Sequence, residues 1–474
     1  MRSTTRHLIS LVISLALTSC AWAQWSSDPA KNLPLADNNN GSDQVQPKVR
    51  PLPRGGWYVS WFDADPQSPP PVGYDVFLQH LNPKGVEQFK HGGIKVADLS
   101  NSSTEDYGLD IDAAGNALLA FLDTREGSNQ QVTAAKMSPT GKALWGPRGV
   151  QLTKGSAHSN HQPKIAGASD GSIIVAWISD NNIVLQKLDA NGKPQWGNGV
   201  VLSESGFSYF LADLHAADNG SVIVSWVREQ GFSGNKLLYA NKIDSSGKLL
   251  WGSTHEKVYE AGSLQFGEFP YFITDGNGGA IFSWYTSIPT LQVFAQHVLS
   301  SGKEAFIHNG SVGSTDSNNL RVDPAISYRS DTNEVFMFWT EEDSNQVLNG
   351  IYAQKFDAKG GRHWGATGLV VVPLGADQQI AARTTHDGHD ALAFWIDQVS
   401  ASGPASIQAT RIHGNGKVAC QQFPVSTAPS NKGRPAADII TSTGLSAIAF
   451  EDDRIGNNGI YIQNVNRDCS LGQK

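Results

Sequence analysis

An aromatic side chain recurs at a nearly constant interval, and this repeat constrains the fold more than any other feature of the chain. Each aromatic ends an alternating apolar stretch, and the eight residues are Trp61, Phe121, Trp177, Trp226, Trp284, Trp339, Trp395 and Phe450. The interval is about 56 residues, within the range of repeats that build solenoids and propellers. A proline precedes five of the aromatics by 14 or 15 residues: Pro47, Pro163, Pro270, Pro324 and Pro435. One repeat architecture therefore replaces the several domains that 474 residues would otherwise suggest.

The third repeat unit predicts four antiparallel strands. Residues 172–177 are rich in the β-branched side chains of a half-buried strand, and 163–167 and 183–188 flank them as further strands. Asn191-Gly192 then predicts a tight hairpin leading to a fourth strand near 200–202. Four consecutive antiparallel strands form one propeller blade. We therefore predict an all-β fold, a single eight-bladed β-propeller over residues 24–474.

The hairpin between the third and fourth strands also repeats. A glycine is followed four residues later by an aromatic in six units: Gly85/Phe89, Gly141/Trp145, Gly192/Trp196, Gly247/Trp251, Gly302/Phe306 and Gly360/Trp364. In the seventh unit Cys420 replaces the aromatic after Gly416. An amide recurs in the third strand of six units, at Gln79, Gln186, Asn241, Gln296, Gln354 and Gln463, and we expect it to join strands by hydrogen bonds.

The eighth unit ends without a fourth strand, shortly after Cys469. The missing strand has a counterpart at the other end of the chain, where Trp25, residues 32–36 and residues 46–49 parallel the pattern around Trp145. We predict that residues 24–46 supply the outer strand of the last blade and its connection. This pairing closes the ring and removes an exposed sheet edge.

The N-terminus predicts export. A basic start, an apolar run from Leu8 to Leu17 and Ala21-Trp22-Ala23 form a secretory signal peptide over residues 1–23. The run is too short to span a membrane as a helix. Cys20 also fits a bacterial lipoprotein box, so lipidation is the alternative to cleavage after Ala23. We expect a periplasmic or extracellular protein or, if Cys20 is lipidated, an outer-membrane lipoprotein whose lipid is its only contact with the membrane.

After cleavage at Ala23 only Cys420 and Cys469 remain, and two cysteines in an exported protein favour a disulfide over two free thiols. The predicted blade map places them at neighbouring positions of the last two blades. The net charge of −8, without any basic block, argues against a nucleic-acid partner. We expect a monomer.

Acidic residues follow the repeat aromatic by two positions in five units: Asp63, Asp123, Glu341, Asp397 and Asp452. Arg125 follows Asp123 and Arg454 follows Asp452 by two positions, whereas the fourth unit has Arg228 in place of the acid. The loops that follow these positions converge at one mouth of the channel, where such a ring could bind a cation, a sugar or a peptide. Because the acids recur with the repeat, we favour a structural role, in which each pairs with a neighbouring blade's arginine or backbone amide.

Departures from the repeat are better functional candidates. His158 and His161 lie between the second and third units, and candidate exposed aromatics for stacking on sugar rings are Tyr107, Phe207, Tyr209, Phe210, Phe266 and Phe269. His158 or His161 with Tyr209 could perform acid–base catalysis. The alternative is that the aromatics pack within loops and the histidines are surface residues.

Metal and cofactor signals are weak. The His158-x-x-His161 pair lacks a clear third ligand. Asp110-x-Asp112-x-x-Gly115 begins like a calcium loop, but Phe121 stands where that loop needs glutamate. The chain has no phosphate-binding loop, nucleophile elbow or CxxC motif. We predict no cofactor and no metal site, and leave a structural calcium open.

Over nearly its whole mature length the chain resembles secreted bacterial propeller-repeat proteins, best at residues 350–357 through Trp364. The resemblance implies a fold and an envelope or extracellular location. The hairpins at 189–196 and 244–251 also resemble the tryptophan-docking turn of eight-bladed quinoprotein dehydrogenases and of the outer-membrane-assembly scaffold lipoprotein. That turn is one residue shorter here, and the dehydrogenases' vicinal cysteines are missing. The turn is loosely similar to the sialidase aspartate box as well.

Three functional hypotheses follow. The first is a non-catalytic exported propeller that binds a glycan or a protein on its loop-rich channel face. The second is a polysaccharide lyase or glycoside hydrolase that uses His158 or His161 with Tyr209, Asp123 or Arg125 on that face. The third is an envelope scaffold lipoprotein that holds partner proteins.

Overall fold

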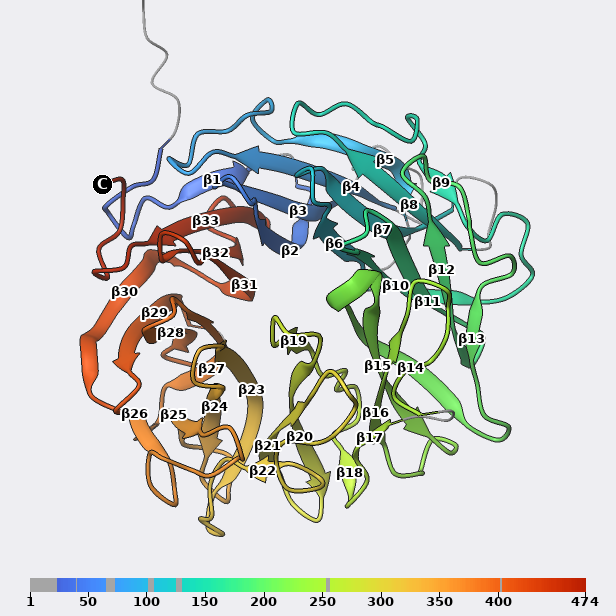
Figure 1. Cartoon of the computed structure of the whole chain (residues 1–474). Coiled ribbons are helices and arrows are strands. Elements are labelled where there is room, and N and C mark those ends of the chain that lie inside the picture. The colour runs from blue at the N-terminus through green and yellow to red at the C-terminus, as the bar shows by residue number, and fades with distance from the viewer. Residues whose placement is uncertain are drawn as a thin grey trace, which may run out of the picture.

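Eight antiparallel sheets surround a central channel in the computed structural model, which confirms the eight-bladed propeller (Figure 1). The structure describes residues 24–39, 41–64, 73–100, 106–124, 130–252, 256–400 and 403–474. Within these residues the only helix is the 3-10 turn η1 (Asp218–Gly220). The signal peptide and Cys20 lie outside the described residues. No helix in the described part of the chain is long and apolar enough to cross a membrane.

The strands run from the channel outward in each blade. Blades 1 to 4 contain β2 (Gln44–Pro51), β3 (Trp57–Ala64), β4 (Tyr74–Leu81) and β5 (Ile94–Ser100); β6 (Gly108–Ile111), β7 (Ala117–Asp123), β8 (Gln131–Met137) and β9 (Val150–Gln151); β10 (Asn160–Gly167), β11 (Ile173–Ser179), β12 (Asn182–Leu188) and β13 (Val200–Leu202); and β14 (Ser208–Ala216), β15 (Val222–Glu229), β16 (Leu237–Ile243) and β17 (Glu256–Tyr259).

In blade 5 the inner strand is split into two pieces. Blades 5 to 8 contain β18 (Ser263–Leu264), β19 (Phe272–Thr274), β20 (Ala280–Ile288), β21 (Gln292–Val298) and β22 (Ser311–Val312); β23 (Leu320–Arg329), β24 (Glu334–Glu342), β25 (Asn349–Phe356) and β26 (Leu369–Gly375); β27 (Gln378–His386), β28 (Asp390–Gln398), β29 (Ala405–His413) and β30 (Val418–Ser430); and β31 (Lys432–Ile440), β32 (Leu445–Asp452), β33 (Gly459–Val465) and β1 (Leu33–Ala36).

The hydrophobic core lies between blades rather than within one centre. Each of the eight interfaces between neighbouring blades holds its own cluster of buried side chains. The middle strands are therefore covered on both faces, and β7 is buried along its whole length. This burial explains why these strands appear in the sequence as continuous apolar runs that end in the repeat aromatic.

The hairpin glycines receive the aromatic of the preceding blade. The indole N–H of Trp25 donates to Pro83 O at 2.8 Å, and that of Trp251 donates to Ser300 O at 3.0 Å. A Cβ added to Gly85 would lie 2.7 Å from the Trp25 ring, so only glycine allows this contact. The same contact between neighbouring blades recurs at Phe89/Gly141, Trp145/Gly192, Trp196/Gly247, Trp251/Gly302, Phe306/Gly360 and Trp364/Gly416.

The recurring amide fixes five of the docked aromatics by hydrogen bonds between strands, as the sequence predicted: Phe89, Trp196, Trp251, Phe306 and Trp364. Gln186 Oε1 accepts from the backbone N–H of Trp196 at 2.9 Å, and its Nε2 donates to Gly197 O at 3.0 Å. Gln354 contacts Trp364 and Gly365 in the same way.

Replacing a docking glycine should destabilise the protein more than replacing an equivalent glycine without a docked ring. Gly302 has φ +82° and its added Cβ would lie 2.9 Å from the Trp251 ring, whereas Gly171, with φ +83°, has nothing within 4 Å. Gly171→Ala should cost about 1–2 kcal/mol, the penalty of a left-handed backbone. Gly302→Ala should cost a further 1–3 kcal/mol, roughly the overpacking penalty. Urea unfolding of both variants measures the difference, and equal midpoints would contradict the docking contact.

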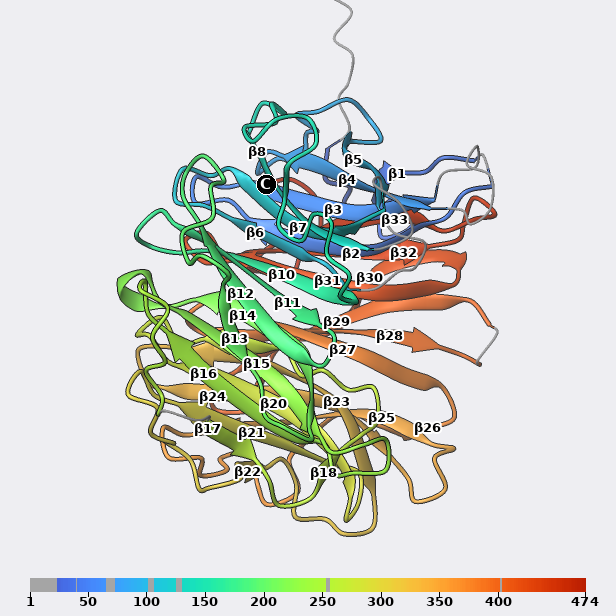
Figure 2. The ribbon, with the colours of Figure 1, turned by 90° about the vertical axis from the view of Figure 1, so that its right-hand side faces the viewer.

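The N-terminal strand closes the ring as predicted. β1 pairs antiparallel with β33, with Leu33 opposite Ile462, so the two ends of the chain share blade 8 (Figures 1 and 2). Asn32 adds hydrogen bonds to Val425 O at 2.9 Å and to Gln463 Oε1 at 3.1 Å. Trp25 is buried, and it docks onto blade 1.

The predicted disulfide between Cys420 and Cys469 is present. Cys469 occupies the hairpin position that glycine fills in other blades, because its φ is +68° and its N–H donates to the residue three before it. Cys420 occupies the position of the docked aromatic. The covalent bond therefore replaces the ring-on-glycine contact at the interface of blades 7 and 8.

Candidate functional site

The inner strands carry a bulge near the channel mouth. The register between the inner strand and the next strand shifts by one residue in most blades. In five blades the residue just before the recurring proline has a positive φ, and in one of these five Ala382 stands in place of the proline. The five residues are Gln46, Gln162, Asp323, Ala381 and Arg434. Bulges change the direction of side chains and are common beside functional sites. The next residues form one level of the channel, where Lys48, Lys164, Asp213 and Arg383 each oppose the residue before the repeat aromatic.

Asp106 is the centre of a cluster that four blades build together. Its Oδ1 lies 2.6 Å from Lys48 Nζ, and its Oδ2 forms an ion pair with Lys164. The hydroxyl of Tyr271, from blade 5, donates to Oδ2 of Asp106 at 3.3 Å. Burial opposes ionisation, but the two ammonium groups outweigh it and hold the pKa of Asp106 far below its usual range. Side chains from blades 1, 2, 3 and 5 are therefore joined to one another in the channel through Asp106.

Tyr271 presents an accessible aromatic ring within this cluster. Its side chain is 57% exposed, and Lys164 Nζ lies 5.2 Å from the ring centroid. The Asp106 carboxylate raises the pKa of Tyr271 to about 12, so the phenol is neutral at physiological pH. The channel mouth thus combines a ring face with a hydroxyl, a carboxylate and ammonium groups.

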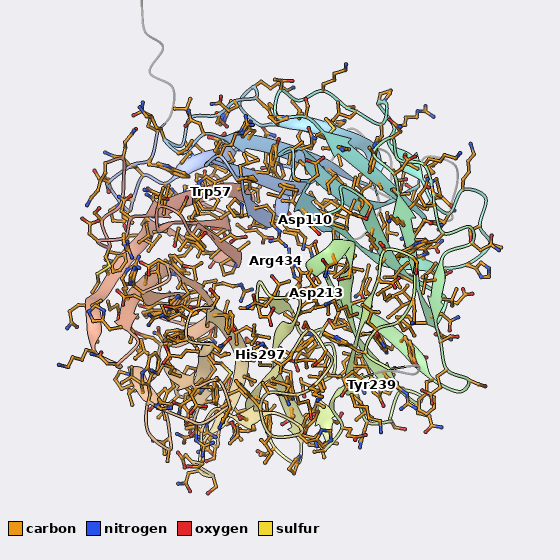
Figure 3. All side chains as sticks on the ribbon, viewed as in Figure 1. Trp57, Asp110, Asp213, Tyr239, His297 and Arg434 are labelled. Atoms are coloured by element: carbon orange, nitrogen blue, oxygen red, sulfur yellow. A yellow bond between two sulfur atoms is a disulfide. The ribbon has the colours of Figure 1, made fainter. Side chains whose placement is uncertain are left out.

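A second level of charged groups lies further along the inner strands. Arg50 is within 3.8 Å of Asp110 and 3.6 Å of Asp438. His215 Nε2 lies 2.9 Å from Asp213 Oδ2. Figure 3 shows Asp110, Asp213 and Arg434 around the centre of the ring. Positive and negative side chains alternate there, so the channel has no strong excess of either sign.

Each acid of the predicted ring contacts a residue of its own blade. Four of the five acids contact the residue that opposes them in the inner strand: Gln44–Asp63 at 3.2 Å, Arg321–Glu341 at 2.9 Å, Gln379–Asp397 at 2.7 Å and Lys432–Asp452 at 3.2 Å. The fifth, Asp123, is buried and accepts from Thr133 at 3.4 Å. The expectation of partners from neighbouring blades is wrong for these contacts, because the opposing residue of the same sheet is nearer.

Burial raises the pKa of three of these carboxyls, those of Glu341, Asp397 and Asp63. It raises the pKa of Asp63 to about 6. Arg454 bonds Asp452, and its guanidinium lies 4.0 Å from the centroid of the Tyr461 ring. A role of these residues in binding stays a prediction. Arg125 lies outside the described residues.

The exposure predicted for Tyr107 and Tyr209 is wrong, since each side chain is only 1% exposed. Tyr107 contacts Ser60 Oγ at 2.8 Å and Gln46 O at 3.1 Å. Tyr209 stacks on Trp226 with ring centroids 5.6 Å apart. Both rings fill space between blades, a role that the loop-like sequence around them did not reveal.

Phe207 and Arg228 form a separate cluster with Glu204. Arg228 donates two hydrogen bonds of 2.7 Å to the Glu204 carboxylate, and its guanidinium lies 3.2 Å from the centroid of the Phe207 ring. The Tyr209 hydroxyl donates to the same carboxylate at 3.3 Å. The Arg228 guanidinium is therefore bound by side chains of the protein itself.

Phe266 is exposed as predicted, at 62%, and packs against Phe232, which is 79% exposed. The ring centroids are 5.3 Å apart. Phe210 and Phe269 are instead partly buried against the core. Their ring centroids lie 6.0 Å apart.

The two candidate histidines make different contacts: His158 lies in the exposed turn before β10, and His161 lies within β10 opposite Ile178. His158 Nδ1 lies 2.6 Å from Asp180 Oδ2, and His161 Nε2 lies 2.6 Å from Ser159 Oγ. The β11–β12 turn, which carries Asp180, adjoins Tyr209, whose backbone N–H donates to Asn181 O at 2.9 Å. The tyrosine hydroxyl is directed to Glu204 instead. Among the described residues no group of three or more His, Cys, Asp or Glu side chains could hold a metal ion.

Sequence reasoning missed Lys48, Asp106, Lys164 and Tyr271. A signal for three of them exists, because the residue after the recurring proline changes from lysine at 48 and 164 to tyrosine at 271. The proline itself marks the bulge, so the varied residue beside it marks the channel. No sequence spacing could show that Tyr271 reaches Asp106 across three blades.

Comparisons with known proteins give distant similarities only. No family model and no curated protein matches the chain. Among solved structures it is similar to prolyl oligopeptidase B from Galerina marginata, with 13% identity and a TM-score of 0.46 over 87% of this chain. The chain spans 55% of the length of that structure.

Two further solved structures have similar lengths. A polysaccharide lyase has 10% identity and a TM-score of 0.45, covering 88% of this chain and 89% of its own. The α-L-arabinanase of Penicillium chrysogenum, complexed with arabinobiose, has 8% identity and a TM-score of 0.38, covering 92% and 97%. None of these similarities bears on the activity of this chain.

Proposed function

We propose that this protein is an exported, non-catalytic propeller that binds a glycan at the mouth of its channel. The observation that carries the proposal is Tyr271, an accessible ring beside the ion pair of Asp106 and Lys164. The signal peptide predicted from the sequence and the Cys420–Cys469 disulfide support export, because disulfides persist in oxidising compartments.

The chemistry of this cluster suits a sugar. An aromatic face packs against the C–H face of a sugar ring, while a carboxylate and ammonium groups can bond its hydroxyls. Lys48 and Lys164 are balanced by Asp106 and Asp213, so the cluster lacks the strong field that recruits nucleic acid or another highly charged polymer. The proposal includes no cofactor and a monomeric protein.

Tyr271→Ala should weaken glycan binding at least about tenfold, equivalent to about 1.4 kcal/mol. Tyr271→Phe keeps the ring and should retain most of the affinity. A glycan array identifies the ligand, and titration calorimetry of the array hit compares the variants. Ile307→Ala, on an exposed apolar side chain between β21 and β22 and outside the cluster, is the control. Equal loss in both alanine variants, or none in Tyr271→Ala, would reject the channel mouth as the site.

Catalysis on a polysaccharide is the second candidate, favoured by the oriented His158–Asp180 pair. A histidine held by a carboxylate can act as a general base, as a lyase or hydrolase requires. Incubation with each array hit tests this function. Unsaturated or shortened sugars whose release is abolished by His158→Ala or His161→Ala would establish an enzyme. If the protein neither binds a glycan nor releases sugars, the result favours a scaffold that holds proteins. This scaffold would be anchored through Cys20 if that residue is lipidated.

A further inference from the structure

The inner strand of blade 5 is interrupted by a segment that other blades lack. Leu264 pairs with Thr286 and Phe272 pairs with Phe282, so the seven residues Gln265–Tyr271 oppose only three on β20. In blade 1 the corresponding bulge adds a single residue between Val45 and Lys48. We refer to Gln265–Tyr271 as the blade 5 segment. It carries two accessible rings, Phe266 and Tyr271.

Apolar contacts hold the blade 5 segment in two places. Phe269 packs on Phe210 of blade 4, with ring centroids 6.0 Å apart, and Pro270 is buried. Phe266 contacts Phe232, but both rings remain exposed. The position of Tyr271 therefore depends on how firmly the residues before it are fixed.

Glu268 is the polar anchor of this segment. Its Oε1 accepts from the backbone N–H of Tyr285 at 2.9 Å. Its Oε2 is buried and has no hydrogen-bond partner among the residues that the structure describes. Burial raises the pKa of Glu268 well above its ordinary value. Backbone hydrogen bonds from Tyr285 and Gln265 lower the pKa of Glu268 by less than burial raises it, so they are too little to support a buried carboxylate charge.

The groups around Glu268 disfavour its ionisation further. Asp323 of β23 raises the pKa of Glu268, and burial raises the pKa of Asp323 and of Glu342 on β24 as well. Tyr285 of β20 contributes no charge at neutral pH, since burial raises its pKa. Arg383 of β27 carries an opposing charge, and it acts on Asp323. A bound proton neutralises the Glu268 carboxyl below its raised pKa.

We propose that Glu268 is a proton-dependent positioning residue: its neutral carboxyl fixes the blade 5 segment with Tyr271 in the channel mouth, and ionisation releases the segment. The ligand readout of this inference rests on the proposed glycan-binding function. Its sign follows from linkage, because a carboxyl whose pKa is higher in the folded protein stabilises the fold below its unfolded-state pKa. That stability is lost as the pH rises through the folded-state value, and the glycan affinity falls with it.

Hydrogen exchange of the 265–271 peptide tests the release without any ligand, with rates corrected for the intrinsic effect of pH. In the wild type, protection should fall at least about tenfold as the pH rises from the ordinary titration range of glutamate into the alkaline range. Glu268→Gln keeps an uncharged side chain of the same shape, so its protection should stay nearly constant. Asp331→Asn, which alters an exposed carboxylate in the β23–β24 turn, should follow the wild type.

Glycan binding, measured with the array hit over the same pH range, supplies the second readout. The wild type should lose affinity as the pH rises, and Glu268→Gln should not. Identical exchange profiles for the wild type and Glu268→Gln would overturn the inference. If exchange shows the release but no glycan binds, the proposed function fails and the role of Glu268 stands. If binding depends on Tyr271 but its pH profile is unchanged in Glu268→Gln, only the role of Glu268 fails.

Discussion

A chain that begins at residue 39 should fail to form the closed ring. The deletion removes β1 and the docked Trp25, and it leaves β33 as an unpaired edge that promotes aggregation. Trp25, Leu33 and Leu35 are all buried, and burial of each such side chain is worth about 1.5–3 kcal/mol. Their combined loss is comparable to the whole stability of a typical domain, about 5–15 kcal/mol.

Small-angle scattering and thermal unfolding measure this effect. We expect a larger radius of gyration, an earlier and broader transition, and association at high concentration. Trp25→Ala is the milder variant, with an expected cost of about 3–5 kcal/mol. Trp145→Ala removes the same type of dock between two blades that remain covalently continuous, and its indole is less buried, so it should cost less. A truncated chain that unfolds at the wild-type midpoint would show that closure by the N-terminus contributes nothing.

The fold could be predicted because its interactions repeat. The same physical requirement recurs at every blade interface, so the buried aromatic, the docking glycine and the amide that fixes the docked ring recur in the sequence. Even the exception at Cys420 was informative, because a repeat shows which position a substitution occupies. Ring closure followed from the same reasoning, since Trp25 fits the repeat although it lies at the other end of the chain.

The candidate site could not be predicted in the same way. Its residues lie where the repeat varies, after the inner-strand bulge, and their meaning depends on which blades face one another across the channel. Asp106 and Tyr271 are 165 residues apart in sequence and come from blades 2 and 5. The acids that did recur with the repeat, such as Asp63 and Glu341, are instead bonded to the opposing strand of their own blade.

The histidines show the converse error. His158 and His161 stood out because the repeat lacks them, but a departure from a repeat identifies a loop rather than a ligand. The structure gives these side chains local partners, Asp180 of the β11–β12 turn for His158 and Ser159 for His161. The blade 5 segment is also a departure, and it differs because it carries two accessible rings, of which Tyr271 reaches Asp106 in the channel cluster.

Loss of the disulfide should give the second large effect. Cys420 and Cys469 are separated by 49 residues, and a cross-link of that loop length restricts the unfolded chain by about 4 kcal/mol. Because this bond replaces the ring-on-glycine dock between blades 7 and 8, removing it also leaves that interface without a link at the hairpin. We expect the Cys420→Ser, Cys469→Ser variant to unfold at a clearly lower denaturant concentration, and a reductant should lower the wild type to the same midpoint.

The chain offers its own compensating change for this interface. Cys420→Trp with Cys469→Gly rebuilds the pair that joins the other blades, since Cys469 already has the positive φ of a hairpin glycine. This double variant should recover part of the lost stability, and a reductant should not affect it. If it unfolds no later than the double serine variant, the two positions do not form an equivalent dock. If the double serine variant unfolds at the wild-type midpoint, the disulfide adds nothing to the ring, and the pairing of β1 with β33 alone keeps blade 8 in place.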